Sequence, residues 1–228
     1  MTLIEAINAR HSVRHYISKP LEHDIVEAIK AKIEDCNREG RLHIQLVTNE
    51  LKGFNGLICY GQFSGVENYL VVAGKNAEDL DYRVGYYGEQ LVLFAQQLGL
   101  GTCWAGLTYS KIKGTYTLDQ GEKIVCMIAL GYPNDPGRKI KRKTIEQLSN
   151  VSSNTPEWFR RGVEAVQKAP TAVNQQKFYF EYLGKSGNTH LVRAKRLFSL
   201  IGYTKMDLGI ARLHFEIGAG GDNFEWED

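Results

Sequence analysis

A cluster of cations follows the first short apolar segment of the chain. The run Arg10-His11-Ser12-Val13-Arg14 places two guanidinium groups around a hydroxyl. Arginine presents several donors in a fixed planar fork, which suits a phosphate or the carbonyl-rich edge of a flat heterocycle. A solvated basic turn is the other interpretation, and the motif alone favours it. His11 and His15 lack the carboxylate support of a metal site, so we expect no metal here.

A second polar motif, Ala-Pro-Thr-Ala-Val-Asn-Gln-Gln, spans residues 169–176. It lies between a predicted helix and a predicted strand, where short polar side chains can direct hydroxyl and amide groups at a ligand. An ordinary turn is the alternative, because Pro-Thr and Asn-Gln are common in turns. Its candidate binding residues are Thr171, Ala172, Asn174 and Gln176.

The third motif, Gly-Leu-Gly-Thr-Cys-Trp-Ala-Gly, spans residues 99–106. Small residues around Trp104, namely Ala105 and Gly106, would let backbone N–H groups approach a flat ligand. A tryptophan buried in a corner of the core is the alternative. We expect Cys103 to pack in the core, since no basic neighbour in the sequence would activate its thiol.

A basic loop carries the fourth motif. Gly-Tyr-Pro at residues 131–133 precedes five cations within residues 138–143, among them Arg142. Such a run would suit a phosphate clamp, a nucleic-acid patch or a solvated loop, and the last is the commonest.

Composition excludes several classes of protein. The 228 residues carry 28 Lys and Arg against 26 Asp and Glu, a net charge of +2, which argues against partners chosen by bulk charge, such as nucleic acid. Hydrophobic residues make up 43%, as in globular domains. No apolar stretch approaches the roughly 20 residues of a membrane helix, and we see no export signal, so we expect a cytoplasmic protein without a membrane partner. The four cysteines lie far apart, which argues against a zinc ribbon.

Hydrophobic periodicity predicts alternating helices and strands, hence a mixed α and β class. Predicted helices cover residues 3–9, 21–39, 79–99, 156–169 and 206–217, and predicted strands cover 42–48, 68–73, 123–130, 178–183 and 190–194. Thr155 is the expected N-cap of the fourth helix, with Pro156 in its first position. The run 123–130 is continuously apolar, which suits a strand covered on both faces. We expect the polar tail after Gly218 to be loosely held.

The order of elements repeats weakly. Residues 21–48 and 156–183 share a helix-then-strand order, and the helix ending near Gly101 is loosely echoed near Gly220. We therefore expect a single unit built of two pseudo-halves, about residues 1–150 and 151–228.

Together the four motifs resemble the FMN-dependent nitroreductase family over most of the chain. The family pattern R-x-S-x-[RK] is matched within residues 10–14, and G-L-G-[ST]-C-W is matched in full at 99–104. Its G-Y-P, followed by a basic pair and a short helix, is matched by 131–133, Arg142 and residues 144–148.

The order of the motifs departs from that family. Its A-P-S-x-x-N-x-Q-P-W pattern stands in the first quarter of ordinary members, but here it falls at 169–176, followed by Lys177 and Phe178 instead of Pro and Trp. Ordinary members are homodimers whose flavin lies between an arginine motif of one chain and an A-P-S motif of the other. This chain resembles a divergent, single-chain version of that dimer, so we expect a monomeric pseudo-dimer.

The resemblance implies a nitroreductase-like α+β fold, with a central mixed or antiparallel sheet flanked by helices and an internal pseudo-duplication. It implies an oxidoreductase that passes a hydride from NAD(P)H through FMN to a nitroaromatic or quinone-like acceptor. A non-enzymatic FMN-binding protein of the same fold is the alternative. The implied FMN contacts are Arg10, His11, Ser12, Arg14, Trp104, Ala105, Gly106, Arg142, Thr171, Ala172, Asn174 and Gln176. The flavin carries the chemistry, so no side chain need act as acid or base.

Overall fold

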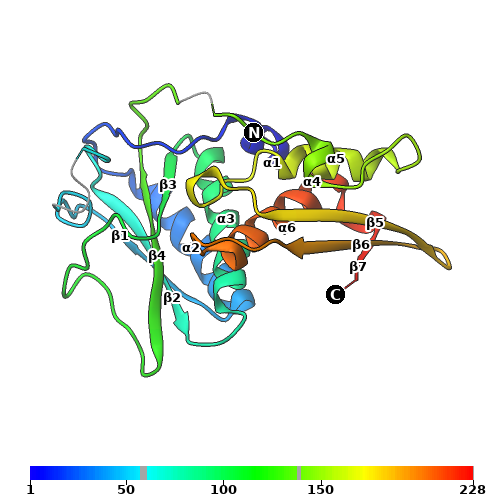
Figure 1. The fold of residues 1–228 in the computed structure, drawn as a ribbon. Helices are drawn as coiled ribbons and strands as arrows, with labels where there is room; N and C mark the ends of the chain where they lie inside the picture. Colours follow the sequence, from blue (N-terminus) through cyan, green and yellow to red (C-terminus); the bar gives the residue numbers. More distant parts are fainter. Residues whose placement is uncertain (57–60, 138–139, 228) are drawn as a thin grey trace.

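The computed structural model describes residues 1–56, 61–137 and 140–227 (Figure 1). Its helices are α1 (Leu3–Ala9), α2 (His23–Gly40), α3 (Leu80–Gln97), α4 (Ile145–Leu148), α5 (Glu157–Val166) and α6 (Thr204–Ala219). Its strands are β1 (His43–Val47), β2 (Asn68–Lys75), β3 (Gly101–Ala105), β4 (Glu122–Gly131), β5 (Phe178–Ser186), β6 (Thr189–Arg196) and β7 (Glu225–Trp226). Antiparallel strand pairing and flanking helices confirm the predicted α+β class.

The larger sheet has the strand order β1-β2-β4-β3 and is antiparallel throughout. Alternate side chains of β2 point to opposite faces, so Leu70 joins the core beneath α2 and α3 while Val71 joins a second core on the other face. The second half of β4 is likewise buried on both faces, with Cys126 in the first core and Met127 in the second, as its apolar run predicts.

The smaller sheet has the order β5-β6-β7, with β5 and β6 antiparallel and β6 and β7 parallel. Helices α5 and α6 pack beside it, and its core is aromatic. Phe180 stacks on Phe215 of α6 with ring centroids 5.1 Å apart, and Phe159 of α5 lies edge-on to Phe215 at 5.5 Å.

Helices α3 and α6 cross closely and join the two sheets into one body (Figure 1). Two glycines allow this approach. A Cβ on Gly85 would lie 2.1 Å from the carbonyl oxygen of Met206, and a Cβ on Gly209 would lie 2.1 Å from that of Tyr82. No larger residue fits either position without moving a helix backbone, so the sequence sets the interhelical distance here.

Three local expectations differ from the structure. The N-cap of α5 is Pro156, not Thr155, whose hydroxyl instead donates to the carbonyl oxygen of Ser152 at 2.8 Å. The segment 101–105 is a strand, β3. The sequence does not predict it, because a short segment with several small residues lacks the pattern typical of a strand. The tail is not loosely held: β7 pairs with β6, and Phe224 packs into the aromatic core because it has apolar partners on α5 and α6.

None of the helices in the described part of the chain combines the length and the hydropathy needed to cross a bilayer.

Candidate functional site

Two adjoining cavities lie where the four sequence motifs converge. The first, about 330 Å³, is lined mainly by apolar groups, and we call it the apolar cavity. The second, about 510 Å³, is lined by several cations, and we call it the basic cavity. Residues that line both are Ser12, Arg14, Pro170, Thr171 and Val173. The two cavities therefore adjoin, and together they make a site with an apolar end and a basic end.

The arginine motif reaches this site because it runs beside β3. Helix α1 ends at Ala9 with Arg10 as its C-cap, and the N–H of Val13 then donates to the carbonyl oxygen of Thr102 at 2.9 Å. Ser12 forms an isolated parallel bridge with the same residue. This pairing holds the motif of residues 10–14 against the motif of residues 99–106.

The basic cavity concentrates positive charge. Arg10, Arg14, Arg142 and Lys168 line it together with His11 and His15, against the carboxylate of Asp135. Burial, followed by the charge of Arg10, lowers the pKa of Arg142. Binding of an anion would stabilise the charged form of Arg142, which burial and the charge of Arg10 disfavour. This end of the site is therefore suited to a phosphate.

Asp135 organises one wall of the basic cavity. Its Oδ1 accepts the N–H of Gly137 at 2.6 Å, and its Oδ2 accepts the N–H of Arg14 at 3.3 Å. Burial raises the pKa of Asp135, but these two hydrogen bonds and the nearby histidines outweigh it and lower the pKa overall. The ionised carboxylate thus fixes the loop that faces the arginine motif.

The motif of residues 169–176 forms a tight turn between the two cavities. Val173 and Asn174 have left-handed φ values of 45° and 55°, and Ala172–Asn174 form a short 3-10 helix. Both carboxylate oxygens of Asp207 on α6 bind this turn. Oδ1 accepts a hydrogen bond from the N–H of Ala172 at 3.0 Å, and Oδ2 accepts one from Nε2 of Gln175 at 2.7 Å. Burial raises the pKa of Asp207 to about 6.

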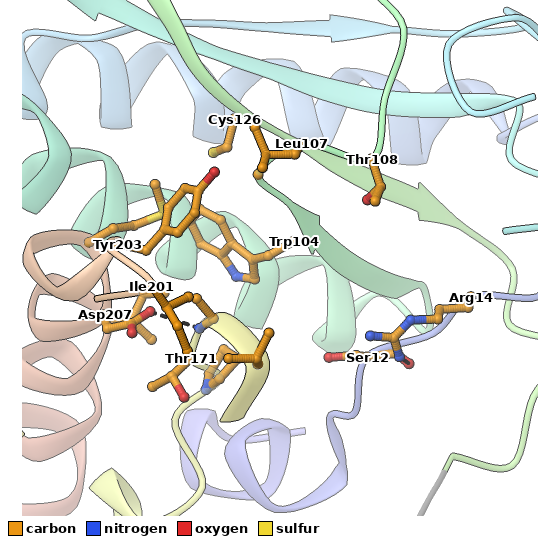
Figure 2. Close-up of a pocket in the computed structure, with 16 residues that line it drawn as sticks. Ser12, Arg14, Trp104, Leu107, Thr108, Cys126, Thr171, Ile201, Tyr203 and Asp207 are labelled. Carbon is orange, nitrogen blue, oxygen red and sulfur yellow. Dashed lines mark hydrogen bonds between the residues drawn. The ribbon is translucent and has the colours of Figure 1, made fainter. Parts of the chain in front are cut away.

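The apolar cavity has an aromatic wall. Trp104 of β3 and Tyr203, which precedes α6, both line it together with Leu107 and Ile201, and Figure 2 shows these side chains around the cavity. A Cβ on Gly106 would lie 2.7 Å from the ring of Tyr203, so only glycine lets β3 end this close to the tyrosine. Met206 and Ile210 of α6 complete the apolar lining.

Ten of the predicted site residues line one or both cavities: Arg10, His11, Ser12, Arg14, Trp104, Gly106, Arg142, Thr171, Ala172 and Asn174. Ala105 is buried in β3 and lines neither. Gln176 is also buried, and its side chain instead accepts the N–H of Lys143 at 2.8 Å and donates to the carbonyl oxygen of Gln167 at 3.1 Å. Arg138 and Lys139 of the basic run lie outside the described residues.

Sequence reasoning missed the contribution of α6 to the site. Tyr203, Met206, Asp207 and Ile210 all line the apolar cavity. The available signal was Asp207, an acidic residue next to the apolar positions 206 and 210 of a predicted helix. Such a residue is buried only with hydrogen-bonding partners, which here lie on the turn 172–175.

The cysteines near the site are packing residues. Burial raises the pKa of Cys103 and, more strongly, that of Cys126, which lines the apolar cavity. Both thiols are thus held in the neutral form, as the sequence predicts for Cys103.

Comparison with known proteins identifies the family. Residues 2–219 match the family described as "Putative TM nitroreductase". The chain belongs to this nitroreductase family and, at the level of the family, is an oxidoreductase. None of the curated proteins matches the sequence.

Solved structures show the same fold. A "putative nitroreductase" from Thermotoga maritima is 24% identical, with a TM-score of 0.62 over 96% of this chain and 83% of that one. A "putative nitroreductase in complex with FMN" from Desulfovibrio desulfuricans is 20% identical, with a TM-score of 0.51 over 68% of this chain and 99% of that one. A nitroreductase family protein from Clostridium difficile is 19% identical, with a TM-score of 0.50 over 68% and 100%.

Proposed function

We propose that this chain is an FMN-dependent oxidoreductase that passes a hydride from NAD(P)H, through FMN, to a nitroaromatic or quinone-like acceptor. The observation that carries the proposal is the adjacency of the two cavities, which share lining residues. FMN has a flat ring system at one end and a phosphate at the other, and the site offers an aromatic-walled apolar cavity beside a cavity lined by three arginines.

The donors present fit FMN. Arg10, Arg14 and Arg142 line the basic cavity and can donate to phosphate oxygens. Ser12 and Thr171 lie at the junction of the cavities, where hydroxyls suit the polar linker between ring and phosphate. Family membership and the FMN complex of a structural relative support the same cofactor.

In this proposal the residues of the chain bind, orient and exclude water. Trp104, Met206 and Ile210 would cover the ring system and keep water from it, and the turn held by Asp207 would set the position of its polar edge. FMN, when bound, supplies the hydride chemistry. The phosphate would be held by Arg142 and Arg10.

We further propose a monomeric pseudo-dimer with halves of about residues 1–150 and 151–228. Arg10 from the arginine motif and Asn174 from the second motif line the same basic cavity within one chain. A second chain is therefore not needed to bring the two motifs together. The free thiols of Cys36, Cys103 and Cys126 suit the reducing cytoplasm, where we place the protein.

The test begins with the purified protein. We expect it to be yellow and to release FMN on denaturation, at about one FMN per chain. Stopped-flow mixing with NADH or NADPH under anaerobic conditions should bleach the flavin absorbance, and a quinone or nitroaromatic should restore it. A protein that binds FMN but is not bleached by either nucleotide would instead be a flavin store or sensor. A protein that does not bind FMN would refute the proposal.

A further inference from the structure

A fully buried carboxylate lies behind both cavities without lining either. Glu89 of α3 is 0% exposed. Its Oε2 accepts the indole N–H of Trp104 at 3.0 Å, and its Oε1 lies 2.9 Å from Nε2 of His214 on α6. Nε of Arg10 lies 3.9 Å from the same Oε1. A single carboxylate thus contacts groups from β3, from α6 and from the end of α1.

The hydrogen-bonding pattern defines where one proton lies. Nδ1 of His214 faces the carbonyl oxygen of Ala165 at 3.1 Å. A carbonyl oxygen only accepts, so Nδ1 must carry a hydrogen. Without a second proton, a lone pair on Nε2 of His214 would face a lone pair on Oε1 of Glu89 at 2.9 Å, which is repulsive. His214 and Glu89 therefore share a proton, and the carboxyl group remains an acceptor toward Trp104.

Two of the three partners of Glu89 lie at opposite ends of the site. Trp104 forms a wall of the apolar cavity, and Arg10 lines the basic cavity. A Cβ on Gly88 would lie 2.5 Å from the indole ring, so Trp104 rests directly on α3 beside Glu89. The ring has contact on one side and a hydrogen bond at its nitrogen, which together restrict its orientation.

The guanidinium of Arg10 has an acceptor on its buried side. Its Nη1 donates to the carbonyl oxygen of Lys168 at 3.3 Å, and its Nε has no hydrogen-bond partner in the described part of the chain. Oε1 of Glu89, 3.9 Å away, is the carboxylate oxygen that faces Nε. Because Glu89 and His214 share a proton and have no net charge as a pair, this contact orients the guanidinium and does not neutralise it.

From this arrangement we propose that Glu89 is a positioning residue that sets both the indole plane of Trp104 and the direction of Arg10. It would thereby align the ring-binding and phosphate-binding ends of one cofactor site. This inference rests on the proposed function for its ligand. The contacts themselves belong to the protein alone, so part of the test needs no ligand.

Two substitutions separate the roles of Glu89. In Glu89→Gln, the amide oxygen can still accept from Trp104 and the amide nitrogen can donate to Nε2 of His214, but the acceptor oxygen that faces Nε of Arg10 is replaced by an NH2 group. In Glu89→Leu, both hydrogen bonds and the oxygen facing Arg10 are lost. Matched controls are Glu216→Gln and Glu216→Leu on α6, because Glu216 also accepts an indole N–H, that of Trp226 at 2.8 Å, away from both cavities.

Equilibrium titrations with FMN and with riboflavin provide the main measurement. For Glu89→Gln we expect riboflavin affinity within about twofold of the parent and FMN affinity lowered about tenfold, because only the phosphate contact of Arg10 is disturbed. For Glu89→Leu we expect both affinities to fall at least about tenfold. The Glu216 variants should leave both unchanged. FMN affinity equal to or above the parent's in Glu89→Gln would overturn the role toward Arg10, and unchanged riboflavin affinity in Glu89→Leu would overturn the role toward Trp104.

Near-UV circular dichroism of the protein without ligand tests the indole separately. The contribution of Trp104, obtained by subtracting the spectrum of the matching Trp104→Phe variant, should persist in Glu89→Gln and disappear in Glu89→Leu. If Glu89→Leu does not fold, a Trp104 contribution lost in folded Glu89→Gln would overturn the inference, and one retained together with the selective FMN loss would support it. A parent protein that binds no FMN would refute the proposed function, and the spectra would still decide the positioning of Trp104.

Discussion

The carboxylate of Asp207 accepts the backbone N–H of Ala172 at 3.0 Å and so connects α6 to the turn that separates the two cavities. The turn contains left-handed residues at Val173 and Asn174, a conformation that costs free energy in residues other than glycine. A hydrogen bond to a buried carboxylate offsets part of that cost. Helix α6 therefore supplies the apolar lining of the site and also maintains the shape of its polar turn.

The buried carboxyl of Asp207 should make the free energy of unfolding depend on pH. Burial raises its pKa in the folded state to about 6, above the ordinary value of 3.8. The folded protein thus binds this proton more tightly than the unfolded chain, and the associated stability is present below about pH 4 and is lost as the pH rises through about 6. Asp207→Asn lacks this ionisation. Its stability relative to the parent should rise by up to about 3 kcal/mol between pH 4 and pH 7.

Urea unfolding at a series of pH values measures this difference. Asp24→Asn, at an exposed position near the start of α2, is the control for the loss of one carboxylate. Parallel stability curves for Asp207→Asn and the parent would show that Asp207 does not titrate in this range.

Charge reversal at Arg142 should weaken FMN binding selectively. Arg142 lines the basic cavity beside Arg10, and its desolvation is relieved by an anion. Arg142→Glu should cost FMN binding about 2–4 kcal/mol, through the loss of a charge-assisted contact and the addition of a like charge. Riboflavin, which has no phosphate, should lose much less, and calorimetric titration with both ligands measures the difference. Lys185→Glu, an exposed site in the β5–β6 hairpin, controls for net charge. An equal loss for both ligands would place the phosphate elsewhere.

A side chain at Gly106 should affect the opposite end of the site. Any Cβ there meets the ring of Tyr203 at 2.7 Å, so Gly106→Val must push the tyrosine aside or into the apolar cavity. We expect FMN and riboflavin affinities to fall together, by tenfold or more (about 1.4 kcal/mol). Gly221→Val, where a Cβ meets nothing, is the matched control. A lower melting temperature with unchanged flavin affinity would show that the contact serves packing alone.

Mixing two inactive variants tests whether one chain builds the whole site. Arg10→Glu and Asn174→Leu each damage one of two residues that line the same cavity. Under conditions that exchange subunits, the mixture should not regain FMN binding, because every chain still carries one damaged motif. A site shared between two chains would restore up to about a quarter to a half of the binding on mixing, depending on how the subunits pair. Recovery of FMN absorbance after gel filtration would therefore contradict the monomeric pseudo-dimer.

Much of the local structure is determined by patterns within single segments. The periodicity of residues 79–99 predicts a helix with one buried side, which the structure has as α3, and the apolar run of 123–130 predicts the strand β4. The four motifs are equally local, and each alone also fits an ordinary turn, loop or core corner. Their combination in one chain, by its resemblance to a known family, predicts FMN binding. Such helices and strands can be predicted from their own residues, because the spacing of apolar residues shows which side of an element is buried.

Which distant groups meet depends on the packing of the whole chain. Asp207 contacts Ala172 across 35 residues, and His214 contacts Glu89 across 125. The position of Asp207 beside apolar residues indicates burial, but neither Asp207 nor His214 carries a local signal that identifies its partner. The close crossing of α3 and α6, set by Gly85 and Gly209, brings Glu89 and His214 together. The motifs of a binding site can thus be read from the sequence, whereas the buried groups that orient them depend on how helices distant in the chain pack.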